Sequence, residues 1–265
     1  MELAEPLPVD VFDSHCHMDI ALEGEPEPVE QALAAAKAVG VTRIVQIGCD
    51  LKSSRWAAEA AASFDDVHGG VAVHPNETTG ITDDDLAEIA RLASLPEVRA
   101  VGETGLDYYR DWADKADQQR SFRAHIDIAK RTGKVLVIHD REAHDDVLRI
   151  LAEEGAPEKV IFHCFSGDAA MARICADRGY TMSFAGNVTF KSAAPLREAL
   201  RVAPPELVLV ETDAPFMAPV PHRGKPNSSA LIPYTVRLMA EVKGVEVDTL
   251  CAAISATGER LFGPW

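Results

Sequence analysis

Six residues of the types that bind divalent metals in hydrolases stand at the ends of apolar runs in this chain. A β-strand that ends in such a residue presents a ligand at the edge of the core, and neighbouring parallel strands bring these ends together. Four imidazoles and two carboxylates suit two divalent ions, and two ions with open coordination positions form a hydrolytic centre. The six residues are His15, His17, Glu103, His139, His163 and Asp213.

The first two histidines form a His-x-His motif after the segment VFDS. Residues two apart on a strand point the same way, so His15 and His17 can reach one metal. Two polar loop residues would give the same pattern by chance. Glu103 lies in the segment GETG, where glycines allow backbone angles that bring a carboxylate close to a metal. A glycine turn with a solvated acid is the alternative there.

His139 and His163 each follow several β-branched or aromatic residues. One such histidine is more often a hydrogen-bonded core residue, but two on consecutive predicted strands, beside a His-x-His motif, favour metal ligands. Asp213 ends the run LVLVETD and suits metal binding and acceptance of a proton from water. A helix N-cap before Pro215 is the alternative for Asp213.

His74 ends a further predicted strand and is a candidate substrate contact or proton donor, with a structural role equally possible. We therefore expect catalytic roles for Asp213, Glu103 and His74. Basic side chains near the strand ends could hold phosphate oxygens, since arginine binds them bidentately, although surface solvation would explain each of them as well. These substrate-binding candidates are Arg110, Arg141, Arg223 and Lys225.

Short β-rich runs alternate with longer stretches of helical periodicity, and these elements must position the candidate ligands. Eight strand–helix units in series predict an α/β fold, a single (β/α)8 TIM barrel of the metal-dependent hydrolase type. We expect one domain over residues 1–265, with a short N-terminal extension at 1–8. A doubly wound open sheet is the alternative, but it would separate the first strand from the eighth, which a closed barrel makes neighbours.

The predicted strands cover residues 9–14, 43–48, 69–73, 100–103, 134–139, 160–162, 180–184 and 207–211. The predicted helices cover residues 29–39, 53–64, 83–94, 115–131, 143–154, 168–177, 193–202, 234–242 and 247–262.

The amino-acid composition of the chain limits the kinds of molecule that it can bind. No apolar run is long enough to span a membrane, and the acidic N-terminus lacks a signal-peptide pattern, so we expect a cytoplasmic protein with no membrane partner. Five widely spaced cysteines argue for a reducing compartment. A net charge of −16 disfavours a long basic groove, so a nucleic-acid substrate should be engaged at an end. We expect a monomer with no obligate protein partner, and Trp56, Trp112 and Trp265 form no recognisable stacking row.

Several motifs together resemble the TatD family of metal-dependent deoxyribonucleases, within the amidohydrolase-like barrels. They run in order along nearly the whole chain and are specific as a set. The chain departs from the family pattern at Ser228-Ser229 and at Thr257, outside the proposed ligands. The matching segments are DSHCHMD at 13–19, GVAVHP at 70–75, VGETGLDYYRD at 101–111, VIHDREAHDDVLRIL at 137–151, HCFSG at 163–167, YTMSFAGNVTF at 180–190 and VETDAPFMAPVPHRGKPN at 210–227.

The resemblance implies a ligand set for two divalent ions, with Zn, Mg, Mn and Ni all possible. It places His15, His17 and Asp213 on one ion and His139 and His163 on the other, with Glu103 bridging. It implies hydrolysis of phosphodiester bonds at DNA ends through a metal-activated water, commonly as a 3′–5′ exonuclease. Nucleic-acid ends or nucleotide-like molecules would be the substrates.

Two other functions stay open at this point. The same metals could polarise a carbonyl, in the ester of a D-aminoacyl-tRNA or in a small amide or ester. A binding or scaffold protein that kept the barrel without its chemistry is the third possibility, and the intact ligand set speaks against it. The sequence does not distinguish exonuclease from endonuclease action.

Overall fold

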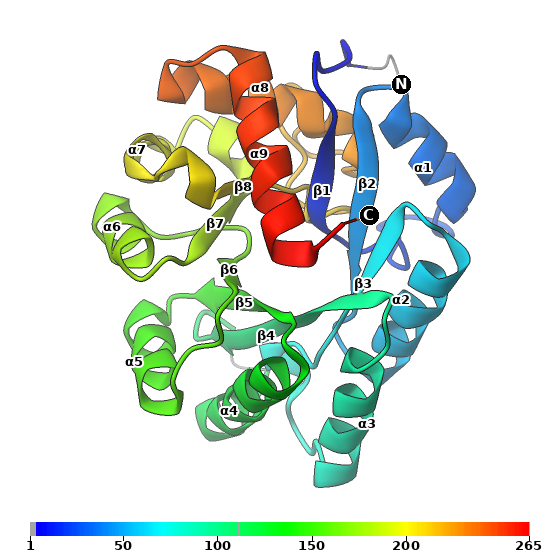
Figure 1. Cartoon of the computed structure of the whole chain (residues 1–265), viewed down its shortest axis with the longest axis vertical. Helices are drawn as coiled ribbons and strands as arrows, with labels where there is room; N and C mark the ends of the chain where they lie inside the picture. The colour runs from blue at the N-terminus through cyan, green and yellow to red at the C-terminus, as the bar shows by residue number, and fades with distance from the viewer. Residues whose placement is uncertain (1–3, 111, 265) are drawn as a thin grey trace. The chain divides into compact units, whose positions relative to one another are not determined.

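Strands and helices alternate along the chain in the computed structural model, which describes residues 4–110 and 112–264 (Figure 1). The strands are β1 (Val11–Cys16), β2 (Val41–Ile47), β3 (Val67–Val71), β4 (Val98–Asp107), β5 (Val135–Arg141), β6 (Val160–Phe162), β7 (Thr181–Phe184) and β8 (Val208–Val210). The helices are α1 (Val29–Lys37), α2 (Leu51–Ser63), α3 (Asp83–Ala93), α4 (Lys115–Thr132), α5 (His144–Glu154), α6 (Ala169–Asp177), α7 (Ala194–Val202), α8 (Ile232–Lys243) and α9 (Val247–Phe262).

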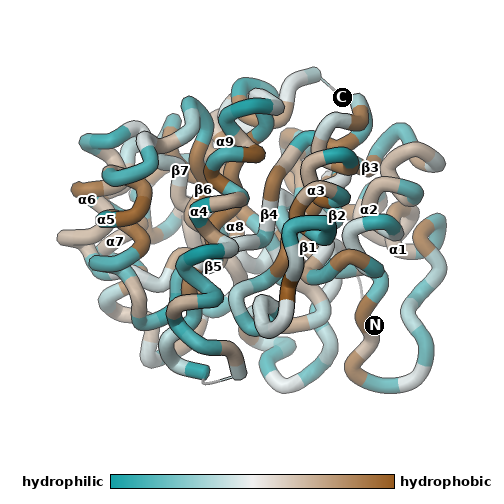
Figure 2. The backbone as a smooth tube through the Cα atoms, turned by 90° about the horizontal axis from the view of Figure 1, so that it is seen from below, coloured by the Kyte–Doolittle hydropathy of each residue, from teal (hydrophilic) through white to brown (hydrophobic). Residues whose placement is uncertain are grey.

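The strands follow one another in chain order, β1 to β8, in a single sheet. This order confirms the predicted (β/α)8 barrel, since a doubly wound sheet would depart from chain order. The strand backbones are almost entirely buried, and the helices alternate hydrophobic and hydrophilic segments, as amphipathic helices over a sheet do (Figure 2). No helix within residues 4–110 and 112–264 is long and apolar enough to cross a membrane.

The chain forms two compact units. The first unit runs up to Val45 and resumes at Gly167, so it holds β1, α1, most of β2, and the elements from α6 onward. The second unit comprises Gln46–Ser166. The single domain over 1–265 and its extension at 1–8 stay predictions, and residues 1–3 of that extension lie outside the described part. Within the extension Leu7 is buried, and its backbone N–H donates to the carbonyl of Val39 at 3.0 Å.

In the first unit, β1 and the segment after β8 lie side by side. The Asp213 N–H donates to the His15 carbonyl at 2.9 Å, and the His17 N–H donates to the Ala214 carbonyl at 2.8 Å. This pairing joins the first strand to the eighth, as expected for a barrel. Helix α9, red in Figure 1, packs against β1 and β8. A side chain at Gly258 would collide with the ring of Phe12, so this close contact requires glycine.

In the second unit, β4 is longer than predicted and runs to Asp107 rather than ending at Glu103. Its pairing with β5 shifts in register between Val101 and Thr104. At this point β4 and β5 approach each other closely, and two glycines make the approach possible. A Cβ at Gly102 would lie 2.4 Å from the Val137 Cβ, and a Cβ at Gly105 would lie 2.1 Å from the His139 carbonyl oxygen. The remaining helix and strand bounds differ from the prediction by about two residues or fewer, the usual uncertainty of element ends.

A buried histidine ties α4 to the end of β3. His125 is fully buried, and its Nε2 accepts the backbone N–H of Val73 at 3.1 Å. Its Nδ1 donates to the carbonyl of Ser121 at 2.7 Å. Both ring nitrogens therefore have partners that require the neutral imidazole, and burial lowers the pKa of His125 to about 4.

This histidine should make stability depend on pH. The pKa of His125 in the folded protein lies below the unfolded value of about 6.5. Its contribution to the free energy of unfolding is therefore complete above pH 6.5 and disappears as pH falls towards 4. The lost stability should be on the order of 3 kcal/mol. Urea unfolding of the wild type and of His125→Asn, from pH 4 to pH 7 in EDTA, measures it. The stability difference between the two proteins should grow with pH, and a constant difference would contradict this role.

Candidate metal centre

Three candidate ligands come together in the first unit; we call His15, His17 and Asp213 the His15 cluster. The Nε2 atoms of the two histidines lie 3.3 Å apart. Asp213 Oδ1 lies 3.5 Å from His17 Nε2 and 3.9 Å from His15 Nε2. His15 is one residue from the end of β1, His17 directly follows β1, and Asp213 follows β8 with a left-handed φ of 54°. The nitrogens and the carboxylate oxygen can therefore approach one cation.

A buried carboxylate fixes the backbone of the His15 cluster. Asp13 Oδ1 accepts the N–H of Thr212 at 2.9 Å and that of His15 at 3.2 Å. Its Oδ2 accepts the hydroxyls of Thr212 and Ser229. Burial raises the pKa of Asp13 to about 7 although all four hydrogen bonds oppose the shift. Asp13 thereby holds the residue before Asp213 against the strand that carries both histidines.

The second unit brings together Glu103, His139, His163 and His74, which we call the Glu103 cluster. Glu103 Oε2 lies 2.6 Å from His163 Nε2, 3.2 Å from His139 Nδ1 and 3.9 Å from His74 Nε2. The facing nitrogens of His163 and His139 are 3.4 Å apart. Glu103 is only 4% exposed, so its charge has protein groups rather than water around it. His74, Glu103 and His139 have ligand atoms close enough together to hold a metal ion.

His74 differs from the other histidines of the Glu103 cluster. Its Nδ1 accepts the backbone N–H of Asn76 at 3.0 Å, so in the neutral ring Nε2 carries the proton. This nitrogen lies 3.9 Å from Glu103 Oε2. With the proton on Nε2, His74 can donate a hydrogen bond, which suits the predicted role as proton donor or substrate contact.

Asp107 is a site residue that was not predicted, although it lies in the segment VGETGLDYYRD. It is 1% exposed, and its Oδ2 lies 3.3 Å from His139 Nε2 and 3.2 Å from Asn76 Nδ2. Burial opposes its charge, but hydrogen bonds from His139, the Arg110 backbone and Asn76 hold the pKa of Asp107 below its usual range. A carboxylate on Nε2 fixes the tautomer of His139 so that Nδ1 is left to face Glu103.

The same contacts act on His139. Burial would lower the pKa of His139, but the hydrogen bonds to Asp107 and Glu103 outweigh it and raise that pKa.

The signal that could have identified Asp107 is its spacing, because residues 103, 105 and 107 point to one side of a strand. Cys49 was also missed, and its thiol donates to Glu103 Oε1 at 3.5 Å.

The four basic candidates come from three places: Arg110 follows β4, Arg141 ends β5, and Arg223 and Lys225 follow β8. Arg110 and Arg141 belong to the second unit and lie over the rings of Trp112 and Tyr109. Arg223 and Lys225 are exposed in the first unit, in the loop after β8, and the Arg223 guanidinium lies 4.3 Å from the ring centroid of Phe190. Their part in binding substrate stays a prediction.

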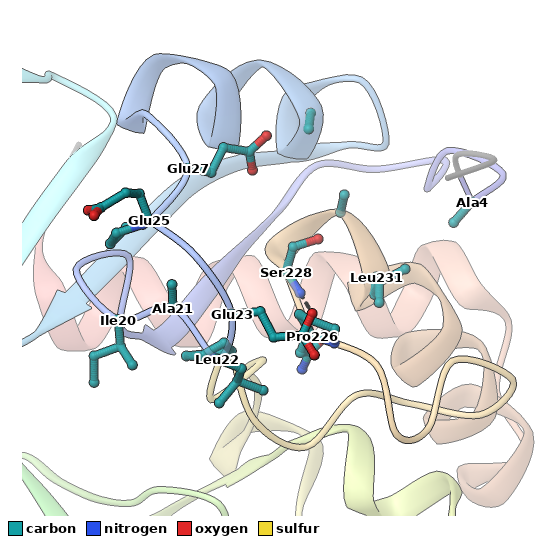
Figure 3. Close-up of a pocket in the computed structure, with 15 residues that line it drawn as sticks. Ala4, Ile20, Ala21, Leu22, Glu23, Glu25, Glu27, Pro226, Ser228 and Leu231 are labelled. Carbon is teal, nitrogen blue, oxygen red and sulfur yellow. Dashed lines mark hydrogen bonds between the residues drawn. The ribbon is translucent and has the colours of Figure 1, made fainter.

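A cavity of about 440 Å³ lies in the first unit (Figure 3). Its walls are the loop between β1 and α1 and the segment before α8. They include Glu23, Glu25 and Glu27, and no lysine or arginine is among the described residues that line them. A smaller cavity of about 90 Å³, lined partly by His17, shares Glu27 and Ser228 with it. These walls suit an uncharged or cationic group better than a phosphate.

Comparisons with known proteins show the family to which the chain belongs. The family described as TatD related DNase matches residues 12–263. The metal-dependent hydrolase TatD of Mycobacterium tuberculosis is 44% identical over 260 residues, covering 96% of this chain and 98% of the relative. The metal-dependent hydrolase YcfH of Escherichia coli K12 is 38% identical over 255 residues, covering 95% of each chain.

Solved structures share the fold. The crystal structure of YJJV, a TatD homologue from Escherichia coli, matches with a TM-score of 0.89 at 24% identity, covering 96% of this chain and 98% of that one. A TatD family hydrolase from Entamoeba histolytica matches with a TM-score of 0.84 at 19% identity, covering 97% and 99%. With the sequence match over nearly the whole chain, these findings show that the protein belongs to the TatD family and is a metal-dependent hydrolase.

Proposed function

We propose that the protein is a deoxyribonuclease that hydrolyses phosphodiester bonds at the ends of DNA with two divalent ions. The Glu103 cluster carries this proposal, because a buried carboxylate lies within 3.9 Å of three imidazole nitrogens. The description of the matching family as TatD related DNase supports the choice of substrate. A monomeric state and a cytoplasmic location belong to the same proposal.

The proposal assigns His15, His17 and Asp213 to one ion. It assigns His139 and His163 to the other, together with Glu103. Mixed imidazole and carboxylate ligands suit zinc, manganese and nickel, and magnesium would depend more on the carboxylates. When bound, such ions polarise the phosphoryl group and lower the pKa of water.

The protein's own groups would handle the protons and the phosphate. Asp213 would accept a proton from the attacking water, since its side chain is still 13% exposed and can be reached. The Nε2–H of His74, oriented by the Asn76 backbone, would donate a hydrogen bond to the phosphoryl or leaving oxygen. Arg110, Arg141, Arg223 and Lys225 would hold neighbouring phosphates.

The acidic cavity in Figure 3 favours a second candidate function. Glu23, Glu25 and Glu27 would attract an ammonium group. The second candidate is therefore hydrolysis of an ester or amide whose substrate bears an amine, such as the ester bond of a D-aminoacyl-tRNA.

A substrate panel separates the two functions. End-labelled DNA oligonucleotides should be shortened from one end in the presence of Mn²⁺, Zn²⁺ or Mg²⁺, whereas a D-aminoacyl-tRNA and simple esters should be cleaved much more slowly. Gel analysis of the labelled products measures this directly. Cleavage of the ester substrates with intact DNA, by protein that contains metal, would favour the second function instead.

The two clusters should contribute separately to metal binding. After gel filtration with zinc, elemental analysis should find two ions per wild-type chain, and fewer in His17→Asn or in His163→Asn. His144→Asn is the matched control, because His144 pairs with Asp140 outside both clusters. An unchanged metal content in both cluster variants, with their folding verified by circular dichroism, would contradict the assignment.

Asp213→Asn should lower kcat by about 10²–10⁴-fold, the usual contribution of a general base, while the protein stays folded. The substituted amide keeps the size of the side chain but cannot accept the proton. Single-turnover cleavage of the labelled oligonucleotide measures the chemical step. A variant with unchanged kcat and normal metal content would show that Asp213 is not the base.

A further inference from the structure

The segment after β4 exposes two aromatic rings in the second unit. Tyr109 is 60% exposed and Trp112 is 62% exposed, although soluble proteins usually bury most of the surface of such side chains. Each ring has a guanidinium over it. Arg141 lies 3.9 Å from the Tyr109 ring centroid, and Arg110 lies 4.4 Å from the Trp112 ring centroid. Much of both rings therefore remains open to a flat ligand.

The backbone of residues 108–110 is held in place. Asp107 Oδ1 accepts the N–H groups of Tyr109 and Arg110 at 3.1 and 3.0 Å. The Tyr108 N–H donates to the Arg141 carbonyl at 2.9 Å. Tyr109 is thus presented by a backbone with fixed hydrogen bonds, which lowers the entropy lost when a ligand stacks on its ring.

The Tyr108 side chain anchors the loop from below. Its hydroxyl donates to Asp146 at 2.7 Å and accepts from Gln119 at 2.7 Å, and the Lys115 ammonium lies 3.9 Å from its ring centroid. Both the hydroxyl and the ring of Tyr108 therefore contact other groups of the protein, in contrast to the exposed ring of Tyr109.

This surface is connected to the Glu103 cluster by one side chain. Asp107 holds the loop with Oδ1 and faces His139 with Oδ2, at 3.3 Å from Nε2. Arg110, Arg141 and Lys115 gather around the aromatic rings of a protein whose net charge is −16. Aromatic faces beside guanidinium groups recognise nucleobases and their phosphates.

We propose that Tyr109 and Trp112 form a stacking subsite for nucleobases of the substrate, with Arg141 and Arg110 contacting the adjoining phosphates. The ligand class rests on the proposed function, because a nucleic-acid substrate supplies the bases. The subsite positions the nucleic-acid strand relative to the Glu103 cluster. It contacts the flat face of a base, so it accepts any of the bases and confers no sequence specificity.

Binding of oligonucleotides with and without bases tests the subsite. Fluorescence anisotropy compares labelled hexathymidylate with the same strand carrying abasic sites at its terminal nucleotides, with Mn²⁺ and phosphorothioate linkages that slow cleavage. Removing the bases should weaken binding to the wild type by about tenfold or more. Tyr109→Ala and Trp112→Ala should bind the normal strand as weakly as the wild type binds the abasic one. Their affinity should also no longer differ between the normal and the abasic strand.

The controls separate stacking from structure. Tyr109→Phe and Trp112→Phe keep a ring and should retain most of the base dependence, and Ile174→Ala removes an exposed side chain from α6 without effect. Hexauridylate in a parallel arm tells RNA from DNA. Equal losses on base removal in the wild type and in the alanine variants, or no base-dependent binding by the wild type, would overturn the subsite. Base-dependent binding without any cleavage would instead refute the proposed nuclease function and leave the subsite standing.

Discussion

Burial of carboxylates among imidazoles is the constraint on which the rest of the structure depends. Glu103 is almost completely buried, with nitrogens of His163 and His139 within 3.2 Å. The interior of a protein penalises a charged carboxylate unless opposite charge and hydrogen bonds compensate for the lost water. Neutral imidazoles around such a carboxylate supply lone pairs, and these donors together fit a divalent cation. The fold must hold these groups together although they come from separate strands.

The scaffold does so through a few specific contacts. Gly102 and Gly105 let β4 approach β5 so closely that any side chain at either position would collide with it. Asp107 fixes His139 on one side and the aromatic loop on the other. In the first unit, Asp13 fulfils the corresponding task by binding the backbones of His15 and Thr212. Two buried aspartates, Asp13 and Asp107, therefore orient the groups that would do the chemistry.

Much of this was predictable because strand periodicity and turn residues are local signals. The (β/α)8 order and the residues of each cluster followed from apolar runs that end in histidine or acid. The extension of β4 beyond Glu103 was not predictable, since it depends on a register shift against β5. The exposed aromatic surface was not predictable from the spacing of the tryptophans. Trp112 stacks with Arg110 and lies near Tyr109 in sequence, so the aromatic surface pairs rings with guanidinium groups and involves no row of tryptophans.

Anomalous diffraction from crystals grown with zinc is the most direct test of metal binding by the two clusters. Data collected above and below the zinc absorption edge should show one strong peak at the nitrogens of His15 and His17 with Asp213. A second peak should lie between Glu103 Oε2 and the nitrogens of His139 and His163. Zinc peaks found only at surface histidines, with both clusters free of anomalous signal, would contradict the assignment of these residues as the metal centre.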